Sequence, residues 1–341
     1  MDNNNESSRH RRLNNIKKQK NQRRKRVLFL FLTIIFLSVI SITGYFAFQT
    51  YVAATNSYEE IDGREAKSDL REDPVYISSD PFSVLILGIE NYMNIYDRGR
   101  SDTIMLATFN PKQQTMKLVS VPRDTYVKIP DYKYDKINHA FSIGGKERVI
   151  ATMEKLLEIP IDYYVTVNFQ GFTNIIDTLG GVTVDVPFDF NDINMDWERF
   201  YFYEGPQKLN GEEALVYARM RKQDPRGDFG RNERQRQIVS GVIEKVSSPA
   251  TFLKIDEIVQ VISENIETNM RMREALAFIK KYPKFSSSSI EQIEIKGSDE
   301  YINGIYYFRP DEESIFSLKT TLMEHLELIS NKAEINSNEG V

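Results

Sequence analysis

Hydrophobic positions from residue 81 onward fall in short blocks, and this pattern predicts strands interleaved with helices. Apolar runs over 81–90 and 163–169 have the length and composition of buried strands. Residues 102–110 and 115–122 flank a short PKQQ turn, so they are predicted to pair as a hairpin whose second strand ends at Pro122. These segments indicate a sheet built early in the chain.

Other segments have the spacing of about 3.6 residues that is typical of amphipathic helices. One helix start is well marked, because Asn210 as N-cap and Glu213 three residues later match a capping box. The predicted helices are 144–159, 172–180, 211–221, 231–246, 252–266, 272–282 and 311–329, and the further strands are 182–187, 290–297 and 302–309. Strands interleaved with helices predict one α/β domain over residues 81–330.

The longest apolar run covers residues 27–48, contains no charged residue, and predicts a transmembrane helix. At a rise of about 1.5 Å per residue it is long enough to cross a hydrocarbon core of roughly 30 Å. Ten Lys and Arg residues lie in the tail 1–26, so the positive-inside rule predicts a cytoplasmic N-terminus and an exported domain. A cleaved signal peptide is the alternative, although its apolar core is normally shorter, at about 7–15 residues.

Polar segments flank the expected domain. Residues 49–80 are expected to form a stalk and residues 331–341 a flexible tail. The chain has no cysteine, which excludes disulfides and thiol nucleophiles. Its net charge is −5 although the tail is strongly basic, so the remainder is acidic and nucleic acid is not an expected partner.

Charged residues gather at the expected strand ends and in one arginine-rich segment. Glu90 closes the first strand, Asp102 opens the second and Arg123 follows the third, which would bring them to one rim of a sheet. Carboxylates suit Mg²⁺, and arginines match phosphate oxygens with two parallel hydrogen bonds. The segment's six arginines are Arg219, Arg221, Arg226, Arg231, Arg234 and Arg236. The pattern predicts a site for pyrophosphate and metal, and solvated strand-end charges are the alternative.

The arginines of the helix 231–246 are expected to differ in role. Arg231 and Gln235 lie one turn apart on the stripe that continues into apolar residues, so both are expected to point inward. Arg234 and Arg236 fall off this stripe and are expected to face solvent.

Three shorter features carry little functional weight. His139 has no second histidine at metal-binding spacing and is expected to be structural. The tripeptides at 226–228 (RGD) and 228–230 (DFG) lack the surrounding motifs that would give them an adhesion or kinase function.

The chain resembles the LytR–CpsA–Psr family, and within it the LytR-like polyisoprenyl-teichoic acid–peptidoglycan transferases. The matching motifs are GRSDTIMLATFNP, VSVPRDTYVKIP, DKINHAF, IDYYVTVNFQGF, LGGVTVDV, LNGEEALVYARMRKQDPRGDFGRNERQRQ and INGIYYF. The resemblance implies a single mixed central sheet flanked by helices, behind one membrane anchor of a Gram-positive bacterium. It also implies transfer of a glycopolymer, with wall teichoic acid expected, from undecaprenyl pyrophosphate to the C6 hydroxyl of N-acetylmuramic acid in peptidoglycan. Undecaprenyl phosphate is released.

The same resemblance assigns residues to roles. The metal-binding aspartate falls on Asp102, and Glu90 stands where many members have a second aspartate, with Mg²⁺ or Mn²⁺ as the expected cofactor. Pyrophosphate contacts fall on Arg123, Lys136, Arg219, Arg221, Arg231 and Gln235, and the expected catalytic set is Arg123, Asp228 and Arg231. The family also implies an apolar tunnel for the prenyl chain.

Two other functions remain open from the sequence. A polyprenyl pyrophosphatase would use the same site with water in place of the sugar hydroxyl. A membrane-bound transcriptional attenuator would need a DNA-binding tail, but residues 1–26 lack a helix-turn-helix pattern.

Overall fold

The computed structural model describes residues 58–62, 64, 67–90, 99–248, 257–258, 260–261, 265–281 and 287–329. All of them belong to one compact unit, Ala53–Val341. The expected basic tail, the transmembrane segment 27–48 and the C-terminal tail 331–341 lie outside the described residues. Across the residues that are described, no helix combines the length and apolar character needed to span a bilayer.

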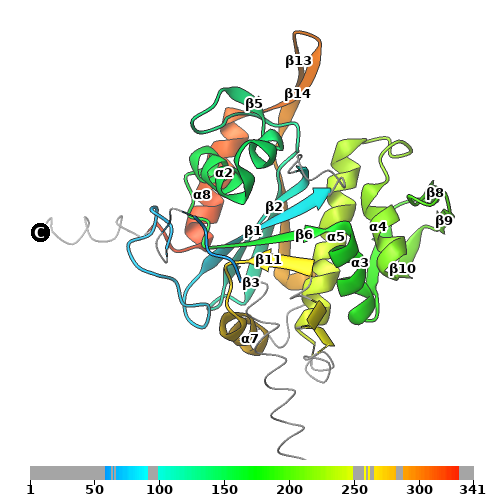
Figure 1. Ribbon diagram of the computed structural model, residues 1–341, viewed down its shortest axis with the longest axis horizontal. Coiled ribbons are helices and arrows are strands. Elements are labelled where there is room, and N and C mark those ends of the chain that lie inside the picture. The colour runs from blue at the N-terminus through cyan, green and yellow to red at the C-terminus, as the bar shows by residue number, and fades with distance from the viewer. Residues whose placement is uncertain are drawn as a thin grey trace, which may run out of the picture. The chain divides into compact units, whose positions relative to one another are not determined.

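A six-stranded mixed sheet forms the centre of the domain (Figure 1). Its strands, in spatial order, are β11 (Ile266–Thr268), β6 (Tyr163–Asn168), β1 (Phe82–Glu90), β2 (Arg100–Asn110), β3 (Thr115–Ser120) and β12 (Ile290–Glu294). The β1/β6 and β3/β12 pairs are parallel, and the other three neighbours are antiparallel. The predicted hairpin of β2 and β3 and the mixed central sheet are therefore confirmed.

Helices cover both faces of this sheet (Figure 1). One face carries α2 (His139–Leu157) and α8 (Glu312–His325). The opposite face carries α5 (Asp228–Val246) and α7 (Met272–Lys281), and α3 (Phe169–Thr178) and α4 (Gly211–Arg219) lie beside α5. The domain is thus a three-layer α/β structure around the sheet.

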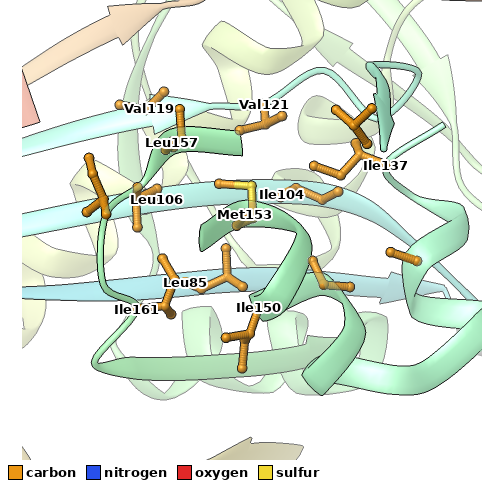
Figure 2. Close-up of a cluster of buried hydrophobic side chains, with 14 of the residues drawn as sticks. Leu85, Ile104, Leu106, Val119, Val121, Ile137, Ile150, Met153, Leu157 and Ile161 are labelled. Atoms are coloured by element: carbon orange, nitrogen blue, oxygen red, sulfur yellow. The ribbon is translucent and has the colours of Figure 1, made fainter. Parts of the chain in front are cut away.

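Alternating side chains of β1 explain why both faces need a cover. Leu85 and Leu87 point into the cluster beneath α2, where Ile150 and Met153 pack against them (Figure 2). Val84, one position away, packs in the cluster on the other face. Because successive residues of a strand point to opposite sides, a strand that is apolar throughout is buried on both faces.

A smaller subdomain is built from residues that the sequence pattern left mostly unassigned. It contains β7 (Val182–Val186), β8 (Phe190–Ile193), β9 (Arg199–Phe202) and β10 (Gly205–Leu209), which form two-stranded sheets outside the central sheet. It packs against α4 and α5 through one hydrophobic cluster. The capping box at the start of α4 is confirmed, since Asn210 Oδ1 accepts from Glu213 N and Glu213 Oε2 accepts from Asn210 N.

Two further hairpins border the sheet, β4 (Tyr126–Lys128) with β5 (Tyr134–Lys136), and β13 (Gly297–Ile302) with β14 (Ile305–Pro310). Element boundaries differ from the sequence pattern where tertiary contacts intervene. Helix α5 begins at Asp228, three residues earlier than expected. The predicted helix 252–266 falls partly outside the described residues, and its last residue begins β11.

The expected stalk 49–80 needs correction over its described part. Ile61 and Ile77 are buried, and Arg71 donates to both carboxylate oxygens of Asp162, at 3.0 and 2.7 Å. Tyr58 also forms a bridge with Thr268 of β11. Scattered apolar residues without a regular period are hard to distinguish from a linker in sequence, but here they cover the sheet edge and the domain begins at least as early as residue 58.

His325 gives the domain an expected pH-dependent stability. The ring is 3% exposed, with Nδ1 2.8 Å from Thr108 Oγ1 and Nε2 3.0 Å from Thr115 Oγ1. Burial, aided by the nearby charge of Lys117, lowers the pKa of His325 from its usual value to about 4. A histidine whose folded pKa is depressed costs stability as pH falls from its unfolded pKa toward the folded one.

We therefore expect unfolding free energy to fall by about 2 kcal/mol between pH 7 and pH 5 through this residue alone. Urea unfolding of wild type and His325→Gln at both pH values measures it. The variant should lose that part of the pH dependence. An equal pH dependence in both proteins would show that His325 is not the titrating group.

Candidate active site

A pocket of about 250 Å³ opens between the sheet, α3, α4 and α5. Its charged lining residues are Asp102, Arg123, Arg219 and Arg231. Its apolar lining includes Ile86, Met105, Val167, Phe169, Phe172, Leu215 and Val239. With three arginines and one carboxylate, the charged part of the pocket has a net positive charge, and it lies beside an apolar cavity.

Arg123 and Asp102 form the first charged pair of this pocket. Arg123 Nη1 donates to Asp102 Oδ1 at 2.7 Å, and both side chains are about one-quarter exposed, at 25% and 23%. Burial alone would lower the pKa of Arg123, but the hydrogen bond and charge of Asp102 outweigh it and leave the pKa raised. The antiparallel order of β1, β2 and β3 brings these residues together, which confirms that their strand ends share one rim.

Arg231 forms a second group with Asp228 and Arg221. Arg231 Nη2 donates to Asp228 Oδ2 at 2.7 Å, and Arg221 Nε lies 3.1 Å from Asp228 Oδ1. Burial, together with the positive charge of Arg123, lowers the pKa of Arg231 even though Asp228 opposes the shift. Arg231 is 7% exposed, as the inward stripe predicted.

Several polar atoms of these two groups are buried without a hydrogen bond. They are Arg123 Nε, which lies 3.5 Å from Asp124 Oδ2 in an ion pair only, Arg231 Nε and Asp228 Oδ1. Buried hydrogen-bond donors of charged groups normally have an acceptor, and a buried donor without one lowers the stability of the fold. Two unsatisfied guanidinium donors near one pocket are what a site for a multivalent oxyanion requires.

The other expected contact residues divide into two sets. Arg219, the last residue of α4, lines the pocket with its guanidinium 4.9 Å from the centre of the Phe169 ring, and Gln235 lines it as well. Lys136 and Arg221 do not line it. Lys136 Nζ instead pairs with Asp124 Oδ1 at 2.6 Å, beside Arg123, so it borders the charged end from outside.

The expectation that Arg234 and Arg236 face solvent is wrong. They are 1% and 3% exposed. The stripe argument assumed that α5 buries one face, whereas the helix is enclosed by the central sheet on one side and by α4 and the small subdomain on the other. Arg234 pairs with buried Asp224, and Arg236 Nη2 donates to Glu294 Oε1 of β12 at 2.6 Å.

Neither arginine lines the pocket, so both are structural. One sequence signal could have revealed this for Arg234. Asp224 lies in the turn just before α5, so it is close enough in sequence to pair with an arginine that is off the apolar stripe of this helix.

The residues around Asp102 suit Mg²⁺ or Mn²⁺ only if the substrate supplies further ligands. Within the described ranges, no group of three or more His, Asp or Glu residues could hold an ion by itself. Asp102 offers a partly exposed hard oxygen at the charged end, and Mg²⁺ commonly uses one or two carboxylates with phosphate and water. The expected second ligand, Glu90, ends β1, and its side chain lies outside what the structure describes.

A larger pocket of about 660 Å³ lies elsewhere, among Arg64, Tyr76, Asp162 and the start of α7. It contains none of the predicted site residues, and its Arg64 and Asp162 are engaged in ion pairs that hold residues 58–80 on the domain. The smaller pocket is therefore the candidate active site, because it joins unsatisfied cationic donors to an apolar cavity.

Fold and site together define an α/β protein with a pocket suited to an amphiphile that has an anionic head. The chain belongs to the LytR_cpsA_psr family, whose profile matches residues 44–324. It is 46% identical over 311 residues to the polyisoprenyl-teichoic acid–peptidoglycan teichoic acid transferase TagV of Bacillus subtilis (strain 168), covering 89% of this chain and 79% of the relative.

Solved structures agree with this assignment. The crystal structure of B. subtilis TagV matches with a TM-score of 0.67 at 47% identity, over 73% of this chain and 98% of that one. The family protein YwtF (TagT), with bound octaprenyl pyrophosphate lipid, matches with a TM-score of 0.63 at 30% identity, over 79% of this chain and 100% of that one.

Proposed function

We propose that this protein transfers a glycopolymer from a polyprenyl pyrophosphate carrier to peptidoglycan. The observation that carries the proposal is the pocket in which Arg123, Arg219 and Arg231 stand beside an apolar cavity. The names of its relatives and the octaprenyl pyrophosphate bound to TagT support it. In its finer form, the carrier is undecaprenyl pyrophosphate, the polymer is wall teichoic acid and the acceptor is the C6 hydroxyl of N-acetylmuramic acid.

The arginines would act on the pyrophosphate. Their guanidinium groups donate to oxygens that gain charge as the phosphoryl group is transferred, and a partly dry pocket strengthens such bonds. The buried Nε atoms of Arg123 and Arg231 have no hydrogen-bond partner among the residues that the structure describes. A bound pyrophosphate would satisfy donors that otherwise cost free energy.

In the transfer reaction, one phosphorus–oxygen bond forms and one breaks. The acceptor hydroxyl oxygen attacks the phosphorus that carries the glycopolymer, a phosphodiester forms, and the P–O–P bridge breaks so that polyprenyl phosphate leaves. We assign Asp228 to receive the hydroxyl proton, because its buried Oδ1 accepts no hydrogen bond from any described residue and contacts Arg221 Nε only as an ion pair at 3.1 Å. Arg221 and Arg231 hold that carboxylate in position.

Asp102 would hold Mg²⁺ or Mn²⁺, with Glu90 as the second candidate ligand. When bound, the ion would offset the negative charge of the phosphate oxygens. Arg123 orients Asp102 through its hydrogen bond.

We further propose that residues 27–48 anchor the protein in the cell membrane of a Gram-positive bacterium, with the N-terminus in the cytoplasm and the catalytic domain outside. The basic residues 1–26 and the uncharged run that follows support this topology. It would bring the pocket to the side of the membrane where peptidoglycan lies.

The direct test is transfer in vitro from a synthetic lipid-linked teichoic acid precursor to peptidoglycan oligomers, with a capsule precursor as competitor. Formation of the phosphodiester-linked product with release of polyprenyl phosphate is the expected result. A parallel reaction without acceptor measures hydrolysis. Rapid hydrolysis that acceptor does not suppress would favour the pyrophosphatase instead.

Replacing Asp102 with Asn is expected to lower metal-dependent transfer by about 100-fold or more, since a neutral amide is a far weaker ligand for a hard cation. Asn can still accept from Arg123, so the melting temperature should stay close to that of wild type. Calorimetry of Mg²⁺ binding in the presence of a pyrophosphate lipid gives an independent measurement. Unchanged metal affinity and unchanged rate would remove Asp102 from the metal site.

A further inference from the structure

Two hairpins beside the candidate site expose an unusual number of aromatic rings. Tyr301 of β13 is 71% exposed and Tyr134 of β5 is 55% exposed. Tyr301 and Tyr306 pair across the β13–β14 hairpin, with ring centres 5.7 Å apart, and Tyr126 stacks on Tyr134 at 5.3 Å. Exposed aromatic rings gathered on two neighbouring hairpins mark a binding site more often than single exposed rings do.

Strand β14 joins these hairpins to the charged end of the pocket through Phe308, which is 1% exposed and lies in the core beneath the surface. Phe308, two residues beyond Tyr306 and therefore on the same face of β14, packs against Phe229 at 5.8 Å. Phe229 follows Asp228 at the start of α5. The backbone of Phe308 also donates to Asp124 O at 2.9 Å, next to Arg123.

Lys136 strengthens this connection. Its Nζ lies 5.8 Å from the centre of the Tyr306 ring and 2.6 Å from Asp124 Oδ1. The charges of Asp124 and Asp228 contribute, after burial and the hydrogen bond to Asp299, to a raised pKa of Tyr306. Tyr306 therefore lies next to Lys136 and Asp124, which border Arg123 at the charged end of the pocket.

The charge of the two hairpins identifies which substrate they suit. Segments 126–136 and 297–310 contain four basic and four acidic residues, so the surface is neutral overall. Its cations are engaged by rings or carboxylates: Arg309 pairs with Glu300 and lies 4.9 Å from the centre of the Tyr126 ring. A neutral aromatic surface suits the faces of sugar rings better than the repeated phosphates of a polyanion.

The position of the hairpin also argues against a membrane partner. Figure 1 shows the β13–β14 hairpin projecting at the top of the domain, away from β11 near the centre of the view. Tyr58, the described residue nearest in sequence to the expected anchor, forms a bridge with Thr268 of β11. The hairpin therefore points away from the place where the chain enters the domain.

We propose that the exposed faces of the β4–β5 and β13–β14 hairpins bind the glycan strand of the peptidoglycan acceptor and guide it to the pocket, which rests on the proposed transferase function. Tyr301 and Tyr306 stack on sugar rings, and Phe229 continues the path to Asp228. The pyrophosphate lipid takes no part in this surface.

The test uses the full chain in detergent, with Tyr301→Ala and Tyr306→Ala made singly and together. Tyr203→Ala, whose ring is 64% exposed near the small subdomain, is the matched control. Four quantities are measured: co-sedimentation with purified, polymer-free peptidoglycan, KM for the acceptor, KM for the lipid donor, and binding to lipid vesicles. The double variant should bind peptidoglycan about tenfold more weakly and show a similar rise in acceptor KM, as expected for lost aromatic stacking. Donor KM and the Tyr203 control should not change.

Three outcomes would overturn the proposal, each in a distinct way. A raised donor KM with unchanged acceptor KM would assign the surface to the glycopolymer, and lost vesicle binding alone would assign it to the membrane. Unchanged values throughout would leave it without a role in binding. Tyr301→Ala keeps the test valid if Tyr306→Ala disturbs the fold, because Tyr301 is mostly exposed. Wild-type binding of peptidoglycan without any transfer would instead contradict the transferase function while supporting the surface.

Discussion

Replacing Arg234 with Ala is expected to lower the unfolding free energy of the domain by about 3–5 kcal/mol, the range for breaking one partner of a buried ion pair. Arg234 is 1% exposed and the side chain of Asp224 is 0% exposed. Its guanidinium donates to Asp224 and, through Nε at 3.1 Å, to Tyr217 O. Without it, the buried Asp224 would keep only a longer ion pair with the half-exposed Arg226, whose Nε lies 3.8 Å from Asp224 Oδ1.

The surroundings offer little room to relax. The Asp224 carboxylate lies against Gly230, where an added Cβ would come within 1.8 Å of Oδ2, so the first turn of α5 closes over the pair. The same turn carries Asp228. We therefore expect the loss of stability to disturb the active site as well.

Urea unfolding and thermal melting measure the effect, with an expected fall in melting temperature of roughly 10 °C for a domain of this size. Arg226→Ala is the matched control for an exposed partner of the same carboxylate, because its side chain is 51% exposed and its Nε lies 3.8 Å from Asp224 Oδ1, so its loss should cost at most about 1 kcal/mol. The double variant Arg234→Met and Asp224→Leu should recover part of the loss, since it removes both charges. A single Arg234→Ala variant as stable as the control would show that the pair contributes little.

Arg231→Ala is expected to reduce transfer by about 10²–10³-fold, corresponding to about 2.7–4 kcal/mol of transition-state stabilisation, as for the loss of one oxyanion-hole donor. Arg231 lines the pocket, and its buried Nε lacks a hydrogen-bond partner. Its guanidinium also orients Asp228. The loss should appear in kcat as well as in the affinity for a polyprenyl pyrophosphate analogue.

Arg231→Lys separates charge from geometry. It keeps the positive charge but not the planar fork, so it should recover only part of the rate. Arg226→Ala again serves as the control from the same segment and should transfer at close to the wild-type rate. If Arg226 and Arg231 variants lose activity equally, the segment acts through its total charge, and the assignment of individual arginines to the pyrophosphate is wrong.

Much of the fold could be predicted because its signals are local. The apolar strands, the β2–β3 hairpin and the Asn210 capping box depend on residues close in sequence, and each is present in the structure. Strands β8, β9 and β10 were missed because they are short, and β7, although predicted, pairs with β10 across the intervening β8–β9 hairpin. The described residues of the expected stalk were misjudged for a related reason, since Ile61 and Ile77 become core residues only when the sheet edge is present.

The candidate site divides in the same way. The sequence by itself determined which residues carry the charge of the site. Asp102 and Arg123 fall at predicted strand ends, and the helical periodicity of residues 231–246 predicted that Arg231 points inward. Motif order identified the family. Helical phase could not show how many sides of α5 are covered, because that depends on two layers meeting around one helix.

Only the tertiary structure therefore decided that Arg234 is a buried structural residue rather than an exposed charge. It also selected the apolar side chains that line the pocket, and it brought the aromatic hairpin 297–310 against Phe229 and Asp124. The physical reason is common to all three. Burial and long-range contact depend on how distant segments pack, whereas propensity, capping and periodicity depend only on neighbours along the chain.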